Sequence, residues 1–304
     1  MSSPTVERLR AQAKARPRRV VLPEVEDSRT ELARRLIEQD GLAEVVWVED
    51  PTRDTRFDEV ASHIFARRRH KGVDEAKATA LASDPLYFAA SLVGIGHADA
   101  SVAGAAHATA DVIRAGIHCV GTAPDSPLVS SFFLFVRDAE TLSYADCGVV
   151  PDPDPDQLAA IAFATARNHE KLTGETARVA FLSFSTKGSA DHPRVDKVRA
   201  ALARFRAQHP RIAADGELQF DAAYVESVAE RKAPDSEVAG SANVFIFPDL
   251  DAGNIAYKIT ERLGGFRAFG PLIQGLARPC LDLSRGCTPE DIVEVAVIAS
   301  AMAE

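Results

Sequence analysis

Short runs of β-branched and aromatic residues alternate along this chain with longer segments of helical periodicity, and this alternation limits the fold more than any other feature. The expected strands lie at 19–23, 43–49, 99–104, 128–136, 178–184, 219–225 and 243–248. The expected helices lie at 26–39, 74–82, 106–116, 154–170, 194–208 and 254–264, with a last one beginning near Pro289. Strands separated by helices pair in parallel, so we predict an α/β protein with a largely parallel, helix-covered sheet.

The chain has 304 residues, 46% of them hydrophobic, which is enough for a large core and typical of two domains. No apolar run approaches about 18 residues, so we expect no membrane span. The basic start MSSPTVERLRAQAKARPRR is compatible with a transit peptide, but Val6, Leu9 and Ala13 recur there at helical spacing. We interpret this stretch as a first amphipathic helix.

The four cysteines, Cys119, Cys147, Cys280 and Cys287, form no CxxC pair and show no regular spacing. We therefore predict no disulfide framework and no metal site, and reduced thiols in a cytoplasmic protein are the simplest interpretation. The net charge of −9 argues against nucleic acid as a partner, since its phosphate backbone needs a basic surface. A small phosphorylated ligand stays compatible with this charge, provided that Arg and Lys gather locally.

The stretch LSFSTKGSADHP, residues 182–193, is a loop that follows an expected strand. Ser185, Thr186 and Lys187 offer hydroxyls, backbone N–H groups and a cation to an anion. An ordinary strand-to-helix connection explains the same residues equally well. No GxGxxG follows a strand and no GxxxxGK[ST] occurs, so the two common phosphate-binding loops are excluded.

A second loop of interest lies in VFIFPDLDAGNIAYK, residues 244–258, where a buried strand runs into a polar turn. Ligands of open α/β sheets bind beyond the carboxyl ends of strands, where this loop should lie. Asp251 or Asn254 can instead serve simply as the cap of the following helix. The residues alone leave both interpretations open.

Basic residues cluster in the run Arg67–Lys71, which is more often a solvated helix face than a binding site. Arg114 stands alone, in a stretch of small and polar residues directly after an expected strand. That position favours a functional role for Arg114 more than for the run.

The stretch LDLSRGCTPEDIV, near the end of the chain, places Ser284 and Arg285 in a loop before the last helix. Thr288 is a suitable N-cap and Pro289 a suitable first helical residue, which puts Asp291 at the third helical position. A capping box prefers Glu or Gln there, because the shorter Asp reaches the cap less well. Asp291 is therefore either a cap or a catalytic residue.

Several stretches, taken together in their order, resemble the phosphotransacetylase (phosphate acetyltransferase) family over nearly the whole chain. They are VLPEVEDSRT, SVAGAAHATADVIRA, SSFFLF, YADCGVVPDP, LSFSTKGSA, DGELQFDAA, KAPDSEVAGSANVFIFPDLDAGNIAYKITERLGG and GPLIQGLARPCLDLSRGCTPEDIV. FPDLDAGNIAYK and DLSRGC are the most specific of these stretches. The resemblance implies reversible acetyl transfer in acetate metabolism, in which acetyl-CoA and phosphate give acetyl phosphate and CoA. CoA is then a substrate, with no tightly bound cofactor and no metal.

The resemblance also implies an architecture. Two α/β domains, 1–125 plus 271–304 and 126–270, would enclose an active-site cleft, and two chains would form a homodimer. Ser284, Arg285 and Asp291 match the family's catalytic residues, while Arg68 and Arg114 match two further functional arginines. Ala115 stands where the family usually has a proline after that arginine. Ser185, Thr186, Lys187 and Asn254 are the remaining candidates for binding phosphate or CoA.

The resemblance leaves three rival functions. A phosphate butyryltransferase would differ in the width of its acyl pocket, whose lining residues one sequence does not identify. A non-catalytic regulatory domain of this fold is disfavoured because Ser284, Arg285 and Asp291 are all present. A dehydrogenase of related architecture would need a nicotinamide cofactor and a divalent metal, for which no residue set is recognisable.

Overall fold

The structure, a computed structural model, describes residues 3–303, and the chain divides into two compact units. One unit comprises Val6–Asp125 together with the stretch from Leu276 onward; we call it the split unit. The other, the continuous unit, comprises Ser126–Gly275 and the start of the chain as far as Thr5. The later division therefore follows Gly275, a few residues beyond the predicted position.

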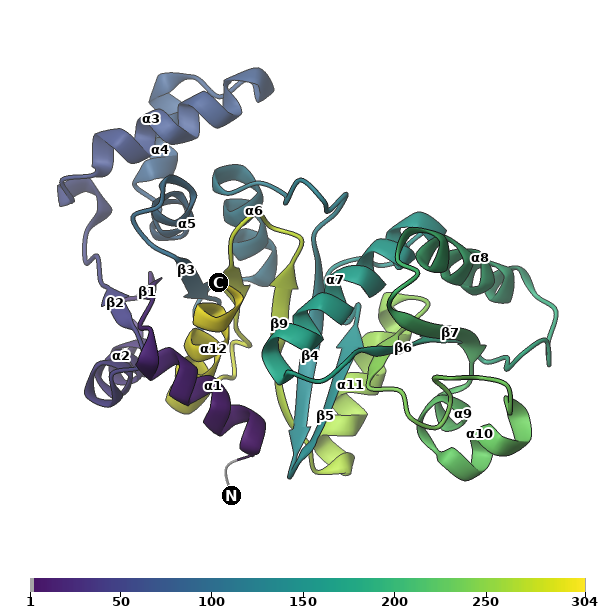
Figure 1. Cartoon of the computed structure of the whole chain (residues 1–304). Helices are drawn as coiled ribbons and strands as arrows, with labels where there is room; N and C mark the ends of the chain where they lie inside the picture. The colour runs from purple at the N-terminus through teal and green to yellow at the C-terminus, as the bar shows by residue number, and fades with distance from the viewer. Residues whose placement is uncertain (1–2, 304) are drawn as a thin grey trace. The chain divides into compact units, whose positions relative to one another are not determined.

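A four-stranded parallel sheet forms the centre of the split unit (Figure 1). Its strands are, in order across the sheet, β10 (Cys280–Asp282), β3 (Ala100–Ala103), β1 (Arg19–Val21) and β2 (Glu44–Val46). Val20 lies opposite both Val45 and Ala100, and Leu281 lies opposite Val102. Because all four strands are parallel, the loops that follow them gather at one edge of the sheet, which is where α/β proteins bind ligands.

The helices of the split unit are α1 (Pro4–Ala15), α2 (Ser28–Asp40), α3 (Phe57–Arg68), α4 (Glu75–Ala82), α5 (Pro85–Ile95), α6 (Thr109–Cys119) and α12 (Pro289–Met302), with short 3₁₀ turns η1 (Pro51–Arg53) and η2 (Arg69–Lys71). Helices α2, α5, α6 and α12 pack on the sheet, whereas α3 and α4 pack on α5. Helices α2 and α12 contact each other, and α12 packs on β1 and β3. Helices α5 and α6 also contact each other, and they pack on β3 and β10 respectively.

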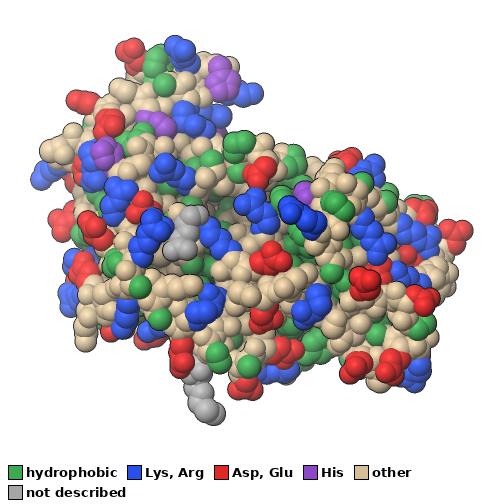
Figure 2. Space-filling model, in the orientation of Figure 1, with side chains coloured by type: hydrophobic (Ala, Val, Ile, Leu, Met, Phe, Trp, Pro, Cys, Tyr) green, Lys and Arg blue, Asp and Glu red, His purple; other side chains and the backbone are tan. Residues whose placement is uncertain are grey.

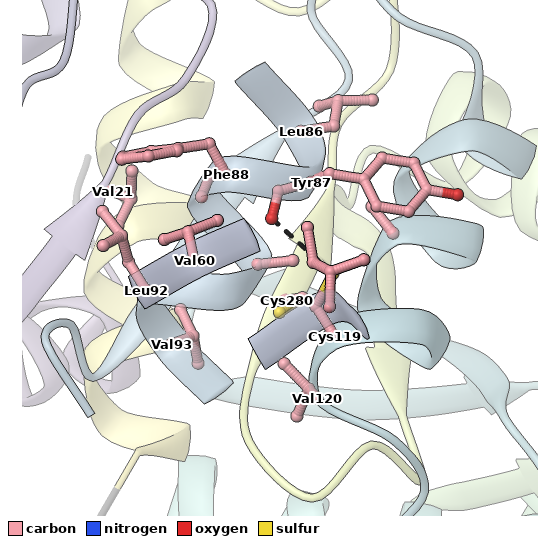
Figure 3. Close-up of a cluster of buried hydrophobic side chains, with 14 of the residues drawn as sticks. Val21, Val60, Leu86, Tyr87, Phe88, Leu92, Val93, Cys119, Val120 and Cys280 are labelled. Atoms are coloured by element: carbon pink, nitrogen blue, oxygen red, sulfur yellow. Dashed lines mark hydrogen bonds between the residues drawn. The ribbon is translucent and has the colours of Figure 1, made fainter. Parts of the chain in front are cut away.

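Helix α5 lies in the core of the split unit. Asp84 caps it and Pro85 begins it, while Gly96 ends it in the left-handed conformation. Its sequence, PLYFAASLVGI, is apolar on nearly every side, as expected of a helix surrounded by protein. Figure 3 shows part of this core, where Phe88 and Leu92 lie close to Val21 of β1.

Within residues 3–303, no single helix is both long and apolar enough to cross a membrane. The strongly bent pair α4–α5 reaches the required length and composition only when its two helices are taken together.

The continuous unit contains a six-stranded mixed sheet (Figure 1). Its strands are, in order, β7 (Ala213–Leu218), β6 (Arg178–Leu182), β8 (Val244–Ile246), β5 (Glu140–Ala145), β4 (Ser130–Arg137) and β9 (Arg267–Gln274). The first four strands are parallel, whereas β4 pairs antiparallel with both β5 and β9. The α/β class with largely parallel strands is therefore confirmed.

The helices of the continuous unit are α7 (Pro155–Thr173), α8 (Pro193–Gln208), α9 (Phe220–Tyr224), α10 (Glu226–Lys232) and α11 (Leu250–Gly264). Helices α7 and α8 pack together and on the sheet, and a buried aromatic cluster including Phe135, Tyr144 and Phe245 fills the core beneath α9 and α11. Helix α7 begins with a complete capping box, in which Asp154 and Gln157 each bond the other's backbone N–H.

The predicted strand at 219–225 is wrong, because Phe220–Tyr224 is helix α9 and the strand β7 ends just before it. A short apolar run fits the two-residue period of a strand as well as the 3.6-residue period of a helix. Here Ala222 and Ala223 are buried together as neighbours on a helix. The pattern also missed β5, β7, β9, β10, α3, α5 and α10. On the face shown in Figure 2, Lys and Arg side chains are interspersed with Asp and Glu over the surface.

Candidate active site

Ser284 and Arg285 lie in the loop that follows β10, at the carboxyl edge of the parallel sheet in the split unit. Both are exposed, although the three residues before them are buried. The loop closes as a turn in which the Cys287 N–H donates to the Ser284 carbonyl at 2.9 Å. The Gly286 N–H donates to Ser284 Oγ at 3.3 Å. A hydroxyl and a guanidinium are thus presented side by side to solvent.

Asp291 closes a capping box at the start of α12. Its Oδ2 accepts the Thr288 N–H at 2.9 Å, and its own N–H donates to Thr288 Oγ1 at 3.2 Å. The shorter Asp side chain therefore does reach the cap, which the sequence pattern had left in doubt. The structural role of Asp291 is observed, and a catalytic role stays a prediction.

Arg29, in the first turn of α2, binds backbone carbonyls of the Ser284–Arg285 loop. Its Nη1 donates to the Arg285 carbonyl at 2.8 Å and to the Cys287 carbonyl at 3.2 Å. Its Nη2 donates to the Ala105 carbonyl at 2.7 Å and to Asp27 Oδ2 at 2.6 Å. One guanidinium therefore joins the loops that follow β1, β3 and β10, which is a role for its planar fork of donors that Lys cannot reproduce.

Glu24 orders the loop between β3 and α6. Its buried carboxylate accepts the N–H groups of Ala105, Ala106 and His107 at 2.8–3.0 Å. His107 Nδ1 also lies 2.8 Å from Glu24 Oε1. Four bonds to charged or backbone groups fix this loop immediately before α6, the helix that carries Arg114.

Arg68 and Arg114 come from different helices, and both act on one pair of side chains. Arg68 ends α3 and is half-buried, with no hydrogen-bond partner for its Nε among the described residues. Arg114 is exposed on α6 and bonds Asp111 at 2.6 Å. Burial together with the charges of Arg68 and Arg114 lowers the pKa of His118. The two guanidiniums therefore create a positive field around His118.

Tyr87 is hydrogen-bonded to His118, with 3.0 Å between Tyr87 Oη and His118 Nδ1. In Figure 3 the Tyr87 ring extends away from the other labelled side chains, while its backbone carbonyl accepts the Cys119 thiol. The pKa of Tyr87 is raised, chiefly by burial, so the phenol stays a neutral donor. Neither Tyr87 nor His118 carries a motif by which sequence reasoning could have singled it out.

In the continuous unit, the 185–190 loop is held tightly against strand β7. The Ser185 hydroxyl and the Gly188 N–H both donate to Glu217 Oε1, and Arg199 binds the same carboxylate at 2.9 Å. Burial alone would raise the pKa of Glu217, but these bonds outweigh it and lower the pKa to about 2. The hydroxyls of Ser185 and Thr186 are buried, the latter against Gln219.

Lys187 is exposed, and its ammonium lies 2.5 Å from Asp215 Oδ1. Arg206 reaches the same carboxylate oxygen at 2.9 Å. Both cations line a polar cavity of about 420 Å³ together with Asp235 and Glu237. Any anion bound by Lys187 would compete with the Asp215 carboxylate for the Lys187 ammonium.

Asn254 lies in α11, whose N-cap is Asp249 and not Asp251 or Asn254. Its amide donates to the Cys147 carbonyl at 3.0 Å, and its side-chain oxygen accepts from Lys258. Capping therefore does not account for Asn254, which instead joins α11 to the loop after β5.

Comparison with known proteins identifies the family. Residues 43–300 match the family model described as "Phosphate acetyl/butaryl transferase". The phosphate acetyltransferase of Paracoccus denitrificans is 44% identical over 97% of this chain and 98% of its own length. That of Thermoanaerobacterium thermosaccharolyticum is 42% identical over 96% and 97%. A crystal structure of a phosphotransacetylase from Streptococcus pyogenes gives a TM-score of 0.93 at 38% identity, covering 100% of this chain and 99% of that one.

The α/β fold and these matches define an acyltransferase. The chain belongs to the phosphate acetyl/butyryl transferase family. The resemblance drawn from the sequence motifs is thereby confirmed.

Proposed function

We propose that this chain is a phosphate acetyltransferase, which converts acetyl-CoA and phosphate reversibly into acetyl phosphate and CoA as a step of acetate metabolism. The observation that carries the proposal is the exposed Ser284–Arg285 pair at the carboxyl edge of the split unit's sheet, held in place by Arg29. The relatives described above support it, because they are named phosphate acetyltransferases.

The reaction needs no covalent enzyme intermediate. A phosphate oxygen attacks the thioester carbonyl carbon, the C–S bond breaks, and CoA leaves as a thiolate. In reverse, the thiolate attacks the carbonyl carbon of acetyl phosphate, and the bond between that carbon and the phosphate oxygen breaks. Arg285 would bind phosphate through its fork of donors and stabilise the developing negative charge, and Ser284 would donate a hydrogen bond to the reacting acyl group. We therefore favour direct transfer within a ternary complex.

Asp291 would accept the proton of the CoA thiol in the reverse direction. With ordinary pKa values, this transfer from thiol to carboxylate is uphill by about 6 kcal/mol. Proton transfer concerted with attack, or a thiol acidified by Arg285, would reduce this cost. The capping box would then serve to position the acceptor beside the loop.

Arg68 and Arg114 would bind the phosphate groups of CoA. The support for this role is that both arginines act on His118, which is hydrogen-bonded to Tyr87. A ligand phosphate there would replace solvent around the exposed side chain of Arg114.

Ser185, Thr186, Lys187 and Asn254 of the continuous unit would contribute to substrate binding. Lys187 is the exposed cation of this set, and the half-buried Asn254 is fixed by its bond to Cys147. The buried hydroxyls of Ser185 and Thr186 would act by shaping the loop that presents Lys187.

A homodimer in the cytoplasm is the proposed working form. Ile255, Ile259 and Leu263 lie at successive four-residue steps on α11, and 58%, 53% and 84% of their surfaces are exposed. Such an apolar stripe on one helix favours contact with a second copy. The four cysteines are free and buried, which suits a reducing compartment.

The test is to mix the purified protein with CoA and acetyl phosphate and to follow thioester absorbance without NAD. We expect thioester to accumulate, and its absence at micromolar enzyme would overturn the proposal. A parallel reaction with butyryl phosphate decides the acyl preference, because a butyryltransferase would use it at least as well.

A further inference from the structure

Asp282 is the last residue of β10 and stands two positions before Ser284, yet its side chain is completely buried. One carboxyl oxygen, Oδ2, lies 2.5 Å from the hydroxyl of Thr109. The other, Oδ1, has no hydrogen-bond partner among the described residues. Leaving one oxygen of a buried carboxyl without a partner costs free energy, above all when the carboxyl is ionised.

Thr109 is the first residue of α6, the helix that carries Arg114. The contact between Asp282 and Thr109 therefore joins the loop of Ser284 and Arg285 to the start of a second helix with a candidate binding residue. Gly104 completes the arrangement, with a φ of +109°. A Cβ on Gly104 would overlap Asp282 Oδ1 and lie 2.7 Å from the Leu283 nitrogen, so β3 and β10 meet here without room for a side chain.

We propose that Asp282 is a positioning residue, which through Thr109 fixes the Ser284–Arg285 loop relative to the N-terminus of α6. The proposal rests on the function proposed above, because it takes Ser284 and Arg285 as the groups that need positioning. Displacing catalytic groups by about 1 Å lowers rates on the order of 100-fold, so a contact of this kind has a large kinetic effect without touching substrate.

The charge state of Asp282 bears directly on this role. Burial raises the pKa of its carboxyl to about 7, with a contribution from nearby Glu24, although the Thr109 hydroxyl and the Leu283 N–H oppose the shift. Below pH 7 the side chain is neutral and can be buried at little cost. Above pH 7 it becomes a buried anion that the Glu24 carboxylate repels, which weakens the packing around Gly104.

Glu24, after β1, is the charged group that acts on Asp282 itself. Arg29 and Asp27 at the start of α2, and Asp291 at the start of α12, act together with Glu24 on Cys287 of the neighbouring loop. His107, before α6, is bonded to Glu24, so a His107 variant serves as a separate control.

The experiment compares Asp282→Asn, Asp282→Ala, Thr109→Val and Thr109→Ser by kcat, by KM for CoA and by melting temperature between pH 6 and pH 9. Asp282→Asn keeps the shape of the neutral acid but cannot ionise. We expect kcat to fall about 10- to 100-fold in Asp282→Ala and Thr109→Val with KM for CoA changed less than threefold, and Thr109→Ser to restore turnover. Thr79→Val on α4, a surface threonine of the same unit, is the control and leaves kcat unchanged.

The pH profile distinguishes positioning from simple stability. The ratio of wild-type to Asp282→Asn turnover should fall as pH rises through about 7, and Asp282→Asn should melt higher than wild type at pH 8. The proposal would be overturned if Asp282→Ala and Thr109→Val fold and keep a kcat within twofold of wild type. It would also be overturned if His107→Gln abolishes the pH dependence of the ratio of wild-type to Asp282→Asn turnover. If Ser284→Ala and Arg285→Gln keep full activity, the catalytic assignment fails instead, whereas the pH dependence of melting tests the buried carboxyl independently of any activity.

Discussion

Arg29 and Arg285 are separated by 256 positions in sequence, and the guanidinium of Arg29 donates a 2.8 Å hydrogen bond to the backbone carbonyl of Arg285. The same side chain also binds the carbonyls of Cys287 and Ala105. The conformation of the candidate catalytic loop thus depends on a residue in the first turn of α2.

Replacing Arg29 with Lys should lower kcat about 10- to 100-fold, because one ammonium cannot span the carbonyls of Ala105, Arg285 and Cys287 at once. The measurement is steady-state kinetics in the thioester assay. Arg35→Lys, on the exposed side of the same helix, is the matched control and should behave as wild type. Equal losses in both variants would mean that α2 itself is perturbed.

Arg285→Gln should reduce kcat about 100- to 1,000-fold while the circular dichroism spectrum and melting temperature stay near wild type. Its side chain is exposed, so the fold does not depend on its charge. Arg53→Gln serves for comparison, since Arg53 is 87% exposed on a 3₁₀ turn of the same unit. Turnover close to wild type in Arg285→Gln would remove this residue from the mechanism.

Asp291 has two candidate roles that substitution can separate. Asp291→Asn keeps an acceptor for the Thr288 N–H but loses the basic carboxylate, so we expect an intact helix, a loss of stability below about 1 kcal/mol and a strong loss of turnover. Asp291→Glu keeps the carboxylate and should retain more activity than Asn. If both variants fold and turn over like wild type, Asp291 is a cap alone.

His169 gives the continuous unit a specific dependence on pH. Burial lowers its pKa to about 4 from an ordinary 6.5, and the ring lies 2.9 Å from the Ser143 hydroxyl. Between pH 6.5 and pH 4 the unfolded chain binds a proton that the folded chain excludes, so stability is lost as pH falls across this window. The loss amounts to about 3 kcal/mol. Urea unfolding at a series of pH values should show a smaller decline for His169→Asn, and an unchanged decline would contradict this assignment.

The apolar stripe on α11 provides a test of assembly. Ile259→Glu places a charge in the middle of the stripe and should convert the proposed dimer to a monomer of unchanged fold. Light scattering after size-exclusion chromatography measures the mass directly. Leu32→Glu, a comparably exposed apolar position on α2, is the control. A wild-type protein that is already monomeric would exclude the dimer.

Sequence patterns were most informative where local rules agree. Helix α7 has both a capping box and a clear apolar face, and its predicted range nearly coincides with the observed Pro155–Thr173. Strand β7 was missed because AADGEL contains no β-branched residue. Its buried Asp215 and Glu217 are compensated by Lys187, Arg206 and Arg199, which belong to other elements.

The candidate site likewise combines features visible in the local sequence with features that depend on distant contacts. The motifs pointed to Ser284 and Arg285, because the stretch LDLSRGCTPEDIV precedes the last predicted helix and matches the catalytic residues of the family. The roles of Arg29 and Glu24 depend on contacts across tens to hundreds of positions, which periodicity and spacing do not encode. The Tyr87–His118 pair is of the same kind.

Strand β10 and helix α12 of the split unit come from residues beyond Leu276, so they are synthesised after the whole continuous unit. The continuous unit is complete on the ribosome before the sheet of the split unit can acquire its edge strand. Until β10 is synthesised, part of the apolar surface of the segment that carries Arg68 and Arg114 stays uncovered. A nascent chain therefore holds the proposed CoA-binding arginines long before it gains the proposed catalytic residues Ser284 and Arg285, which follow β10.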